Sequence, residues 1–238
     1  MLYEDLKFPQ IEGRPFFYSN FVTTLDGKVK VCKKGYWPIG SRRDYETLLE
    51  LRAYADVLIH GKKTVGGSRT LSSISTPEFE KMRQDIGKDQ PLIYLVISAH
   101  PDDSLIEVLR DERDIKHILA TTDEAVISPE LEKIVEVVRL GPEKADIKRL
   151  SEFLFSKGFK DILVEGGPHV MGGFYEEDLI DELFLTISPK VLGSDESAIT
   201  MVEGLLLPPD KIRQFKIMSV KQVEDELFLR YQINRSDE

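Results

Sequence analysis

Short runs of apolar and β-branched residues, each closed by a turn signal, recur along this chain. The clearest run covers residues 16–24 and ends at Leu25-Asp26-Gly27. The other runs of this kind lie at residues 57–59, 92–97, 115–121, 133–138, 162–165, 183–188, 215–220 and 227–233. Runs of this composition, bounded by Gly, Pro, Asp or Ser, are typical of β-strands.

Helical patterns lie between several of these strands. Residues 41–44, Ser-Arg-Arg-Asp, fit a capping box at the start of a helix. Residues 76–78, Thr-Pro-Glu, place a proline at the first position of another helix. Residues 146–157 form a third helical pattern, and Gly158 is well placed as the left-handed residue that ends it.

The order of these elements predicts the fold class. Strands alternate with helices, and the inner strands are apolar on both faces, as in parallel sheets covered by helices. The runs 215–220 and 227–233 flank an acidic turn and predict an antiparallel hairpin. We therefore expect an α/β protein, a three-layer αβα sandwich with a mostly parallel central sheet and an antiparallel C-terminal end. The sequence has no internal repeat or linker, so residues 1–238 are predicted to form a single domain.

Composition and charge narrow the class of protein. Of the 238 residues, 41% are apolar and 31% are charged, with no apolar run that could cross a bilayer and no apolar stretch of a secretory signal in the first ten residues. The net charge of −10 argues against general nucleic-acid binding, although local donors could still hold a small anion. The lone cysteine, Cys32, fits a reducing compartment. We expect a cytoplasmic protein with a small-molecule substrate and no nucleic-acid or membrane partner.

Glycines gather where the run 162–165 ends. Glu165 is followed at once by Gly166-Gly167 and further on by Gly172-Gly173, where a helix could begin. In an open α/β sheet, ligands bind beyond the carboxyl ends of the strands, and the free N–H groups of a helix start suit a pyrophosphate. A tight turn with small residues for packing explains the same glycines, and spacing alone does not decide between the two.

Two more strand ends carry groups that could contact an anion. Gly61-Lys62-Lys63-Thr64 follows the run 57–59, although a solvated lysine pair is the commoner explanation of such a loop. Ser98 follows the run 92–97, where it could also simply start a turn. Together with the glycines, these residues place three candidate anion contacts on one edge of the sheet.

Metal and hydrolase chemistry have little support in the sequence. The four histidines, His60, His100, His117 and His169, show no paired spacing, so no metal is expected. His60 and His117 lie in apolar runs and are interpreted as core or edge residues. A GxSxG motif is absent from the sequence, so a hydrolase of that type is not indicated.

Three segments resemble a known family. Residues 14–28, 48–65 and 163–195 are similar to the reductase domain of the riboflavin-biosynthesis deaminase/reductase, which has a dihydrofolate-reductase-like fold. The third segment is the most specific, because it joins Glu-Gly-Gly, Leu-Ile-Asp-Glu and Pro-Lys-Val-Leu-Gly in that order. The sequence has no deaminase domain and no zinc signature, so only the reductase half is recognised. The resemblance implies a dihydrofolate-reductase-like fold, NADPH as cofactor and a homodimer.

The resemblance also implies which residues hold NADPH. Residues 167–173 would cradle the diphosphate, and Trp37 matches a tryptophan near the nicotinamide. Lys62 would meet the 2′-phosphate, because its turn resembles the Gly-Arg-x-Thr turn of dihydrofolate reductases. The full set of implied cofactor contacts is Trp37, Lys62, Thr64, Ser98, Gly166, Gly167, Pro168, His169, Val170, Met171, Gly172 and Gly173.

The substrate side matches the family less well. Glu165 matches a glutamate that faces the substrate, and Arg52 matches a substrate-side arginine, with a solvated helix arginine as the alternative. The family motif Asp-Asp-Pro-x-Leu-Thr-x-Arg is replaced here by residues 66–74, Gly-Gly-Ser-Arg-Thr-Leu-Ser-Ser-Ile. Ser68 stands where an acidic residue is expected, and the arginine that meets the substrate phosphate has no clear counterpart. Arg52, Ser68 and Leu71 are the predicted substrate contacts.

The implied activity is NADPH-dependent reduction of the 5-amino-6-(5-phosphoribosylamino)uracil type, in which a ribosyl group becomes ribityl. Glu165 is one catalytic candidate, since it could orient the substrate, or donate a proton if burial raises its pKa. Asp26 is the second, although an Asp-Gly turn explains it equally well. Two alternatives stay open. One is a reductase of the same fold acting on dihydrofolate, another pterin or another carbonyl compound, and the other is a non-catalytic nucleotide-binding member of the family.

Overall fold

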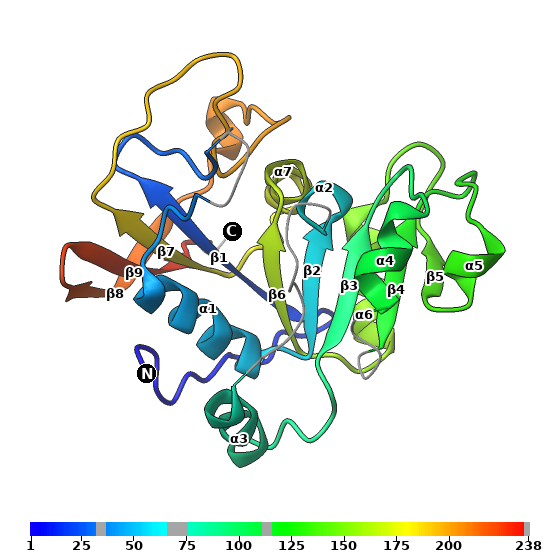
Figure 1. Ribbon diagram of the computed structural model, residues 1–238, viewed down its shortest axis with the longest axis horizontal. Helices are drawn as coiled ribbons and strands as arrows, with labels where there is room; N and C mark the ends of the chain where they lie inside the picture. The colour runs from blue at the N-terminus through cyan, green and yellow to red at the C-terminus, as the bar shows by residue number, and fades with distance from the viewer. Residues whose placement is uncertain (32–36, 66–75, 111–115, 236–238) are drawn as a thin grey trace.

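The computed structural model describes residues 1–31, 37–65, 76–110 and 116–235. Within them the strands are β1 (Phe16–Thr24), β2 (Val57–Gly61), β3 (Ile93–Ile97), β4 (His117–Thr121), β5 (Glu136–Arg139), β6 (Asp161–Gly166), β7 (Glu182–Ser188), β8 (Phe215–Val223) and β9 (Glu226–Ile233). They form one sheet in the order β5-β4-β3-β2-β6-β1-β7-β9-β8 (Figure 1). The strands from β5 to β7 in this order are parallel, whereas β9 and β8 are antiparallel.

Helices cover both faces of this sheet. They are α1 (Arg42–Tyr54), α2 (Lys62–Val65), α3 (Pro77–Asp85), α4 (Ser104–Arg110), α5 (Pro129–Glu132), α6 (Ile147–Ser156) and α7 (Pro168–Glu176), with a 3₁₀ turn at Pro209–Lys211. Apolar residues of α1, α3, α4 and α5 join one buried cluster, and those of α6 and α7 join a second on the opposite face. The predicted three-layer sandwich with an antiparallel C-terminal end is therefore confirmed. Across the ranges just given, no helix combines the length and apolar content that a membrane crossing requires.

Strand β1 lies between β6 and β7, and both of its faces carry apolar side chains. Phe16 and Tyr18 join the cluster under α1, while Phe17 and Phe21 join the cluster under α7. Successive side chains of a strand point to opposite faces, so this alternation packs both helical layers against one strand. Apolar side chains at neighbouring positions of the run, such as Phe16-Phe17-Tyr18, are the direct consequence.

The predicted helix starts are confirmed by their caps. The side chains of Ser41, Thr76 and Asp146 each accept a hydrogen bond from a backbone N–H group of the first turn. Gly158 ends its helix with a φ of +82°, which only glycine adopts at little cost. Helix α4 was not predicted, because its seven residues, SLIEVLR, carry neither a proline nor a complete capping signal.

The capping box predicted at residues 41–44 is only half formed. The Ser41 hydroxyl accepts from the N–H groups of Arg43 and Asp44, as predicted. The Ser41 N–H group, however, donates to Glu226 Oε1 at 2.9 Å and not to Asp44. A residue distant in the sequence has therefore taken the place of the local partner.

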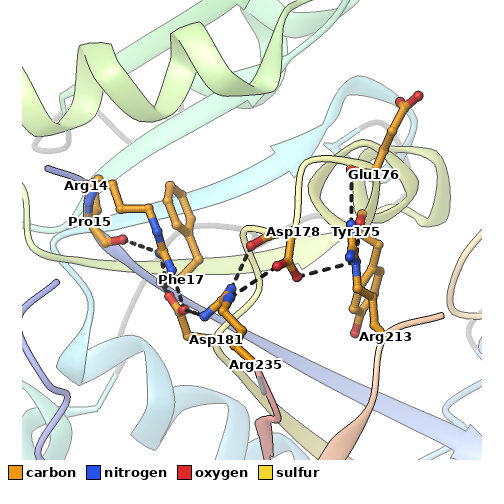
Figure 2. Close-up of polar contacts among 9 residues, drawn as sticks. All are labelled: Arg14, Pro15, Phe17, Tyr175, Glu176, Asp178, Asp181, Arg213 and Arg235. Carbon is orange, nitrogen blue, oxygen red and sulfur yellow. Dashed lines mark hydrogen bonds and ion pairs between the residues drawn. The ribbon is translucent and has the colours of Figure 1, made fainter. Parts of the chain in front are cut away.

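A cluster of three arginines and two aspartates fastens the chain at the amino end of β1 (Figure 2). Asp181, whose side chain is 3% exposed, pairs with Arg14 at 2.7 Å and with Arg235 at 2.6 Å. Asp178 pairs with Arg235 at 3.2 Å and with Arg213 at 3.3 Å. This clasp joins the residues before β1, the connection from α7 to β7, and the residues that flank β8 and β9.

Candidate active site

The starts of two helices meet at the carboxyl edge of the sheet. Helix α2 follows β2, α7 follows β6, and these strands are neighbours, so the helices lie side by side (Figure 1). A Cβ atom added to Gly167 would lie 3.0 Å from Thr64 Oγ1. The structure thus brings together Thr64 and Gly167, which were predicted as cofactor contacts from separate parts of the sequence.

The start of α7 offers backbone donors that no side chain caps. Gly167 is the N-cap residue and makes no side-chain cap hydrogen bond, and Pro168 has no N–H group. The Met171 N–H group donates to Gly167 O at 3.1 Å, which leaves those of His169 and Val170 without a partner inside the helix. Unpaired N–H groups at the positive end of a helix fit a diphosphate, so residues 167–170 suit the cofactor that the sequence implies.

The backbone conformation at position 166 requires a glycine. Its φ is +96°, and an added Cβ atom would lie 3.0 Å from the ring of Phe21. A side chain would therefore be strained and would collide with the core. The Gly166–Gly167 peptide bond is cis.

Within the predicted cradle over residues 167–173, the last three residues pack against the rest of the protein. Met171 is fully buried in the core. A Cβ atom on Gly172 would lie 2.7 Å from the carbonyl oxygen of Glu203, and one on Gly173 would lie 3.0 Å from Ile147 Cγ1. The second glycine pair allows close packing of α7 against its neighbours, which is the alternative that the sequence left open.

Glu165 lies at the centre of a buried polar group. Arg52 donates to it twice, from Nε to Oε1 at 2.7 Å and from Nη2 to Oε2 at 2.6 Å. His60 Nε2 lies 3.0 Å from Glu165 Oε2, and His60 Nδ1 lies 3.0 Å from the Tyr94 hydroxyl. The side chains of Arg52, His60 and Glu165 are 5%, 3% and 4% exposed. Arg52 is therefore not a solvated helix arginine.

This environment overturns one expectation about Glu165. Burial does raise the pKa of its carboxyl group, but the charge and hydrogen bonds of Arg52, helped by His60, outweigh burial and bring the pKa down to about 2. The carboxylate is therefore ionised at neutral pH. The condition set for proton donation by Glu165, a pKa raised by burial, is therefore not met, because of two partners that the sequence did not reveal.

The pKa of the Asp26 carboxyl group is also lowered, but for a different reason. It is half-buried, and the hydrogen bond from Thr24, followed by those from the Leu192 and Gly193 N–H groups, lowers its pKa to about 2. Its carboxylate accepts from Gly193 N at 2.8 Å and Leu192 N at 3.2 Å, and so ties the end of β1 to the loop after β7. The turn interpretation fits Asp26 better than proton donation does.

Lys62 and Ser98 lie where β2 and β3 end. Lys62 Nζ donates to the carbonyl oxygen of His100 at 2.9 Å and pairs with the carboxylate of Asp102. Ser98 is buried, and its N–H group donates to Ala120 O at 3.0 Å. A cavity of about 600 Å³ opens beyond them, lined by Ala99, His100, Pro101, Thr122, Glu124, Ala125, Val126, Pro142 and Glu143.

The segment that carries Trp37 is held from the end of β7. Trp37 is 57% exposed, and the next two residues are Pro38 and Ile39. Ser188 Oγ donates to Ile39 O at 2.8 Å, and Lys190 Nζ donates to the carbonyl oxygens of Pro38 and Ile39. Through Lys190, the segment Pro-Lys-Val-Leu-Gly thus helps to hold Trp37, the predicted neighbour of the nicotinamide, at the carboxyl end of β7.

The remaining predicted residues divide into two groups. His169 is exposed, and its ring lies against the position of Gly204. Ser68 and Leu71 lie outside the described residues, as does the departing stretch 66–74. In the part of the chain that is described, no three His, Cys, Asp or Glu side chains gather as a metal ion would require.

Sequence reasoning missed His60, which was interpreted as a core or edge residue. Its strand position opposite Gly166 places it beside Glu165. The only signal in the sequence was its place one residue before the Gly61 turn, at a strand end.

A comparison with protein families shows which family the chain belongs to. The sequence model described as the RibD C-terminal domain matches residues 15–229. The chain belongs to this family. The resemblance noted in the sequence is thereby confirmed, and the glycine turn before α7 and the Arg52–Glu165 pair lie within the matched residues.

Relatives of the RibD C-terminal domain family span most of the chain. A protein from Archaeoglobus fulgidus named 2,5-diamino-6-ribosylamino-4(3H)-pyrimidinone 5′-phosphate reductase is 25% identical over 93% of this chain and 100% of the relative. Riboflavin biosynthesis protein RibD from Chlamydia muridarum is 28% identical over 90% of this chain but only 57% of its own length. The crystal structure of a pyrimidine reductase-like protein from Corynebacterium diphtheriae superposes with a TM-score of 0.73 at 21% identity, over 93% of each chain. The fold is therefore that of the family.

Proposed function

We propose that this protein is a nicotinamide-dinucleotide-dependent reductase of riboflavin biosynthesis that acts on 2,5-diamino-6-ribosylamino-4(3H)-pyrimidinone 5′-phosphate. The observation that carries this proposal is the relative of that name, which aligns with 93% of this chain over its whole length. NADPH is the cofactor that the sequence resemblance implies. We further propose a cytoplasmic enzyme that reduces the ribosyl group to ribityl.

The carboxyl edge supplies the cofactor half of the site. The N–H groups of His169 and Val170 would bind the diphosphate, and the Thr64 hydroxyl beside Gly167 would complete this contact. The exposed ring of Trp37 would flank the nicotinamide. When bound, the reduced nicotinamide would supply the hydride.

We assign Glu165 and Arg52 a positioning role on the substrate side. Their paired side chains join α1 to the end of β6, and His60 joins the same carboxylate to β2. Three elements are therefore held in one arrangement where the sheet meets the cofactor edge. Glu165 and Asp26 are both ionised at neutral pH, so neither is assigned as the donor of the proton that accompanies the hydride.

We also propose that the protein works as a homodimer, as its family resemblance implies. Strand β8 is at the edge of the sheet and exposes apolar side chains, with Ile217 58%, Met218 48% and Val220 55% exposed. Exposed apolar residues on an edge strand favour association with a second strand. Light scattering of the purified protein tests this, and a monomer at micromolar concentration would contradict it.

Steady-state assays decide the substrate. We expect oxidation of the reduced dinucleotide with the diaminopyrimidinone substrate, and slower oxidation with 5-amino-6-(5-phosphoribosylamino)uracil, which is the closest alternative. Turnover with dihydrofolate alone would replace the proposal by a pterin reductase. Binding of dinucleotide with no turnover of any of the three would support the non-catalytic alternative.

A further inference from the structure

The adenosine end of the proposed cofactor has a definite place along the sheet. If α7 holds the diphosphate at the end of β6, the rest of the dinucleotide must extend over β2, β3 and β4, which follow in that order. Three strand spacings, from β6 to β4, cover about 14 Å. The cavity of about 600 Å³ opens at this distant end, beyond β3 and β4.

Lys62 lies between the start of α7 and this cavity. It begins α2 next to Thr64, which contacts Gly167, and its ammonium group donates to the carbonyl oxygen of His100 on the cavity wall. On this path it is the described base best placed to meet a phosphate on the ribose. That is also the role that the sequence resemblance implies for it.

The charge of Lys62 is already neutralised, however. The carboxylate of Asp102, from the turn before α4, pairs with its ammonium group, and the side chains of Lys62 and Asp102 are 27% and 58% exposed. The hydrogen bond from Lys62, with a second from Ser104, lowers the pKa of Asp102 to about 2, so this carboxylate is ionised at neutral pH. Two of the three N–H groups of this ammonium are used by His100 and Asp102, so a phosphate bound by the third would lie beside the Asp102 carboxylate.

The cavity adds further negative charge. Glu124 and Glu143 line it, and no Lys or Arg is among its lining residues in the described part of the chain. A carboxylate at the ribose accepts from the 2′-hydroxyl of NADH, whereas a 2′-phosphate needs a cation. The local charges therefore favour the ribose hydroxyl over the phosphate.

We propose that Asp102 selects the cofactor. By neutralising Lys62 at the ribose end of the site, it makes NADH bind at least as tightly as NADPH, in contrast to the NADPH dependence that the sequence resemblance implies. The inference rests on the proposed function, since it assumes a dinucleotide that runs from α7 to the cavity.

Isothermal titration calorimetry with NADH and with NADPH tests the proposal on three proteins, the wild type, Asp102→Asn and Asp103→Asn. We expect a wild-type Kd for NADPH no lower than that for NADH. Asp102→Asn frees Lys62, and removal of one charge near a phosphate is worth about tenfold in the Kd for NADPH, with the Kd for NADH changed by less than about twofold.

Asp103→Asn is the matched control. It removes the same charge one residue further on, but the Asp103 carboxylate accepts from Ser128 and leaves the Lys62–Asp102 pair intact. We expect its ratio of the two Kd values to equal that of the wild type.

The outcomes separate the two proposals. A wild type that binds NADPH tenfold more tightly than NADH overturns the selecting role of Asp102 and leaves the reductase proposal standing. Equal gains in NADPH affinity from Asp102→Asn and Asp103→Asn would assign the effect to the total charge. This result would also overturn the selecting role of Asp102. If circular dichroism shows a folded protein that binds neither dinucleotide, the proposed function and this inference both fail.

Discussion

Among single residues, Glu165 shows how neighbours decide the state of a buried acid. Its side chain is 4% exposed, and burial alone would favour the neutral form. The two hydrogen bonds from Arg52 and the contact with His60 favour the charged form instead. Removing one member of such a group leaves the other as an uncompensated buried charge, and this costs far more than an exposed pair does.

We therefore expect Glu165→Gln to lower the free energy of unfolding by about 3 kcal/mol or more at pH 7, because Arg52 stays buried without a carboxylate. Urea denaturation measures this. The pKa of Glu165 is lowered from 4.5 in the unfolded chain to about 2, so its contribution is present above pH 4.5 and is lost as pH falls toward 2. The free energies of unfolding of Glu165→Gln and of the wild type should therefore converge as the pH falls toward 2.

Glu46→Gln is the control, since Glu46 pairs with Arg42 and Arg43 on the same helix but on its outer side. It should cost less than about 1 kcal/mol. Equal losses for the two variants would contradict the buried-pair account. Unchanged turnover in a folded Glu165→Gln protein would remove the proposed positioning role.

Helix α7 divides its glycines between two tasks according to position. Gly167 stands before the first turn, where its missing side chain leaves the N–H groups open beside Thr64. Gly173 lies in the second turn, where its missing side chain admits Ile147 of α6. The first position concerns a ligand and the second concerns packing, although both glycines belong to similar pairs in the sequence.

Two alanine substitutions separate these tasks. Gly167→Ala should weaken dinucleotide binding about tenfold, because the new methyl group crowds Thr64 and the diphosphate site, and should change stability by less than about 1 kcal/mol. Gly173→Ala should lower stability by about 1–3 kcal/mol through overpacking against Ile147, with dinucleotide affinity kept. Calorimetric binding and urea denaturation of both variants check this. A loss of affinity in Gly173→Ala with a loss of stability in Gly167→Ala would contradict this division between binding and packing.

Over the whole molecule, the candidate site and the clasp lie at opposite edges of the sheet. The candidate site uses the carboxyl ends of β2, β3 and β6. The clasp, which includes Arg14, Asp181 and Arg235, lies at the amino end of β1 (Figure 2). The clasp joins the residues before β1 and after β9 to the connection between α7 and β7. The antiparallel C-terminal hairpin is thereby attached to the parallel sheet independently of the site.

Asp181→Asn should therefore destabilise the protein without changing its ligand affinity. Asp181 is 3% exposed and pairs with two guanidinium groups, so we expect a loss of about 3 kcal/mol in urea denaturation. Asp178→Asn is the comparison, since Asp178 is 35% exposed and should cost about 1 kcal/mol or less. A selective loss of dinucleotide affinity in Asp181→Asn would show that the two edges are coupled.

The sequence by itself determined the layers, the strand positions, the helix caps at Ser41, Thr76 and Asp146, and the glycine turn after Glu165. These features follow from alternation, caps and turns, which depend on residues near one another in the chain. Only the tertiary structure decided that Glu165 is ionised by Arg52, 113 residues away, and that Lys62 is paired with Asp102, 40 residues away. The state of a charged side chain depends on what surrounds it in space, and local patterns do not contain that information.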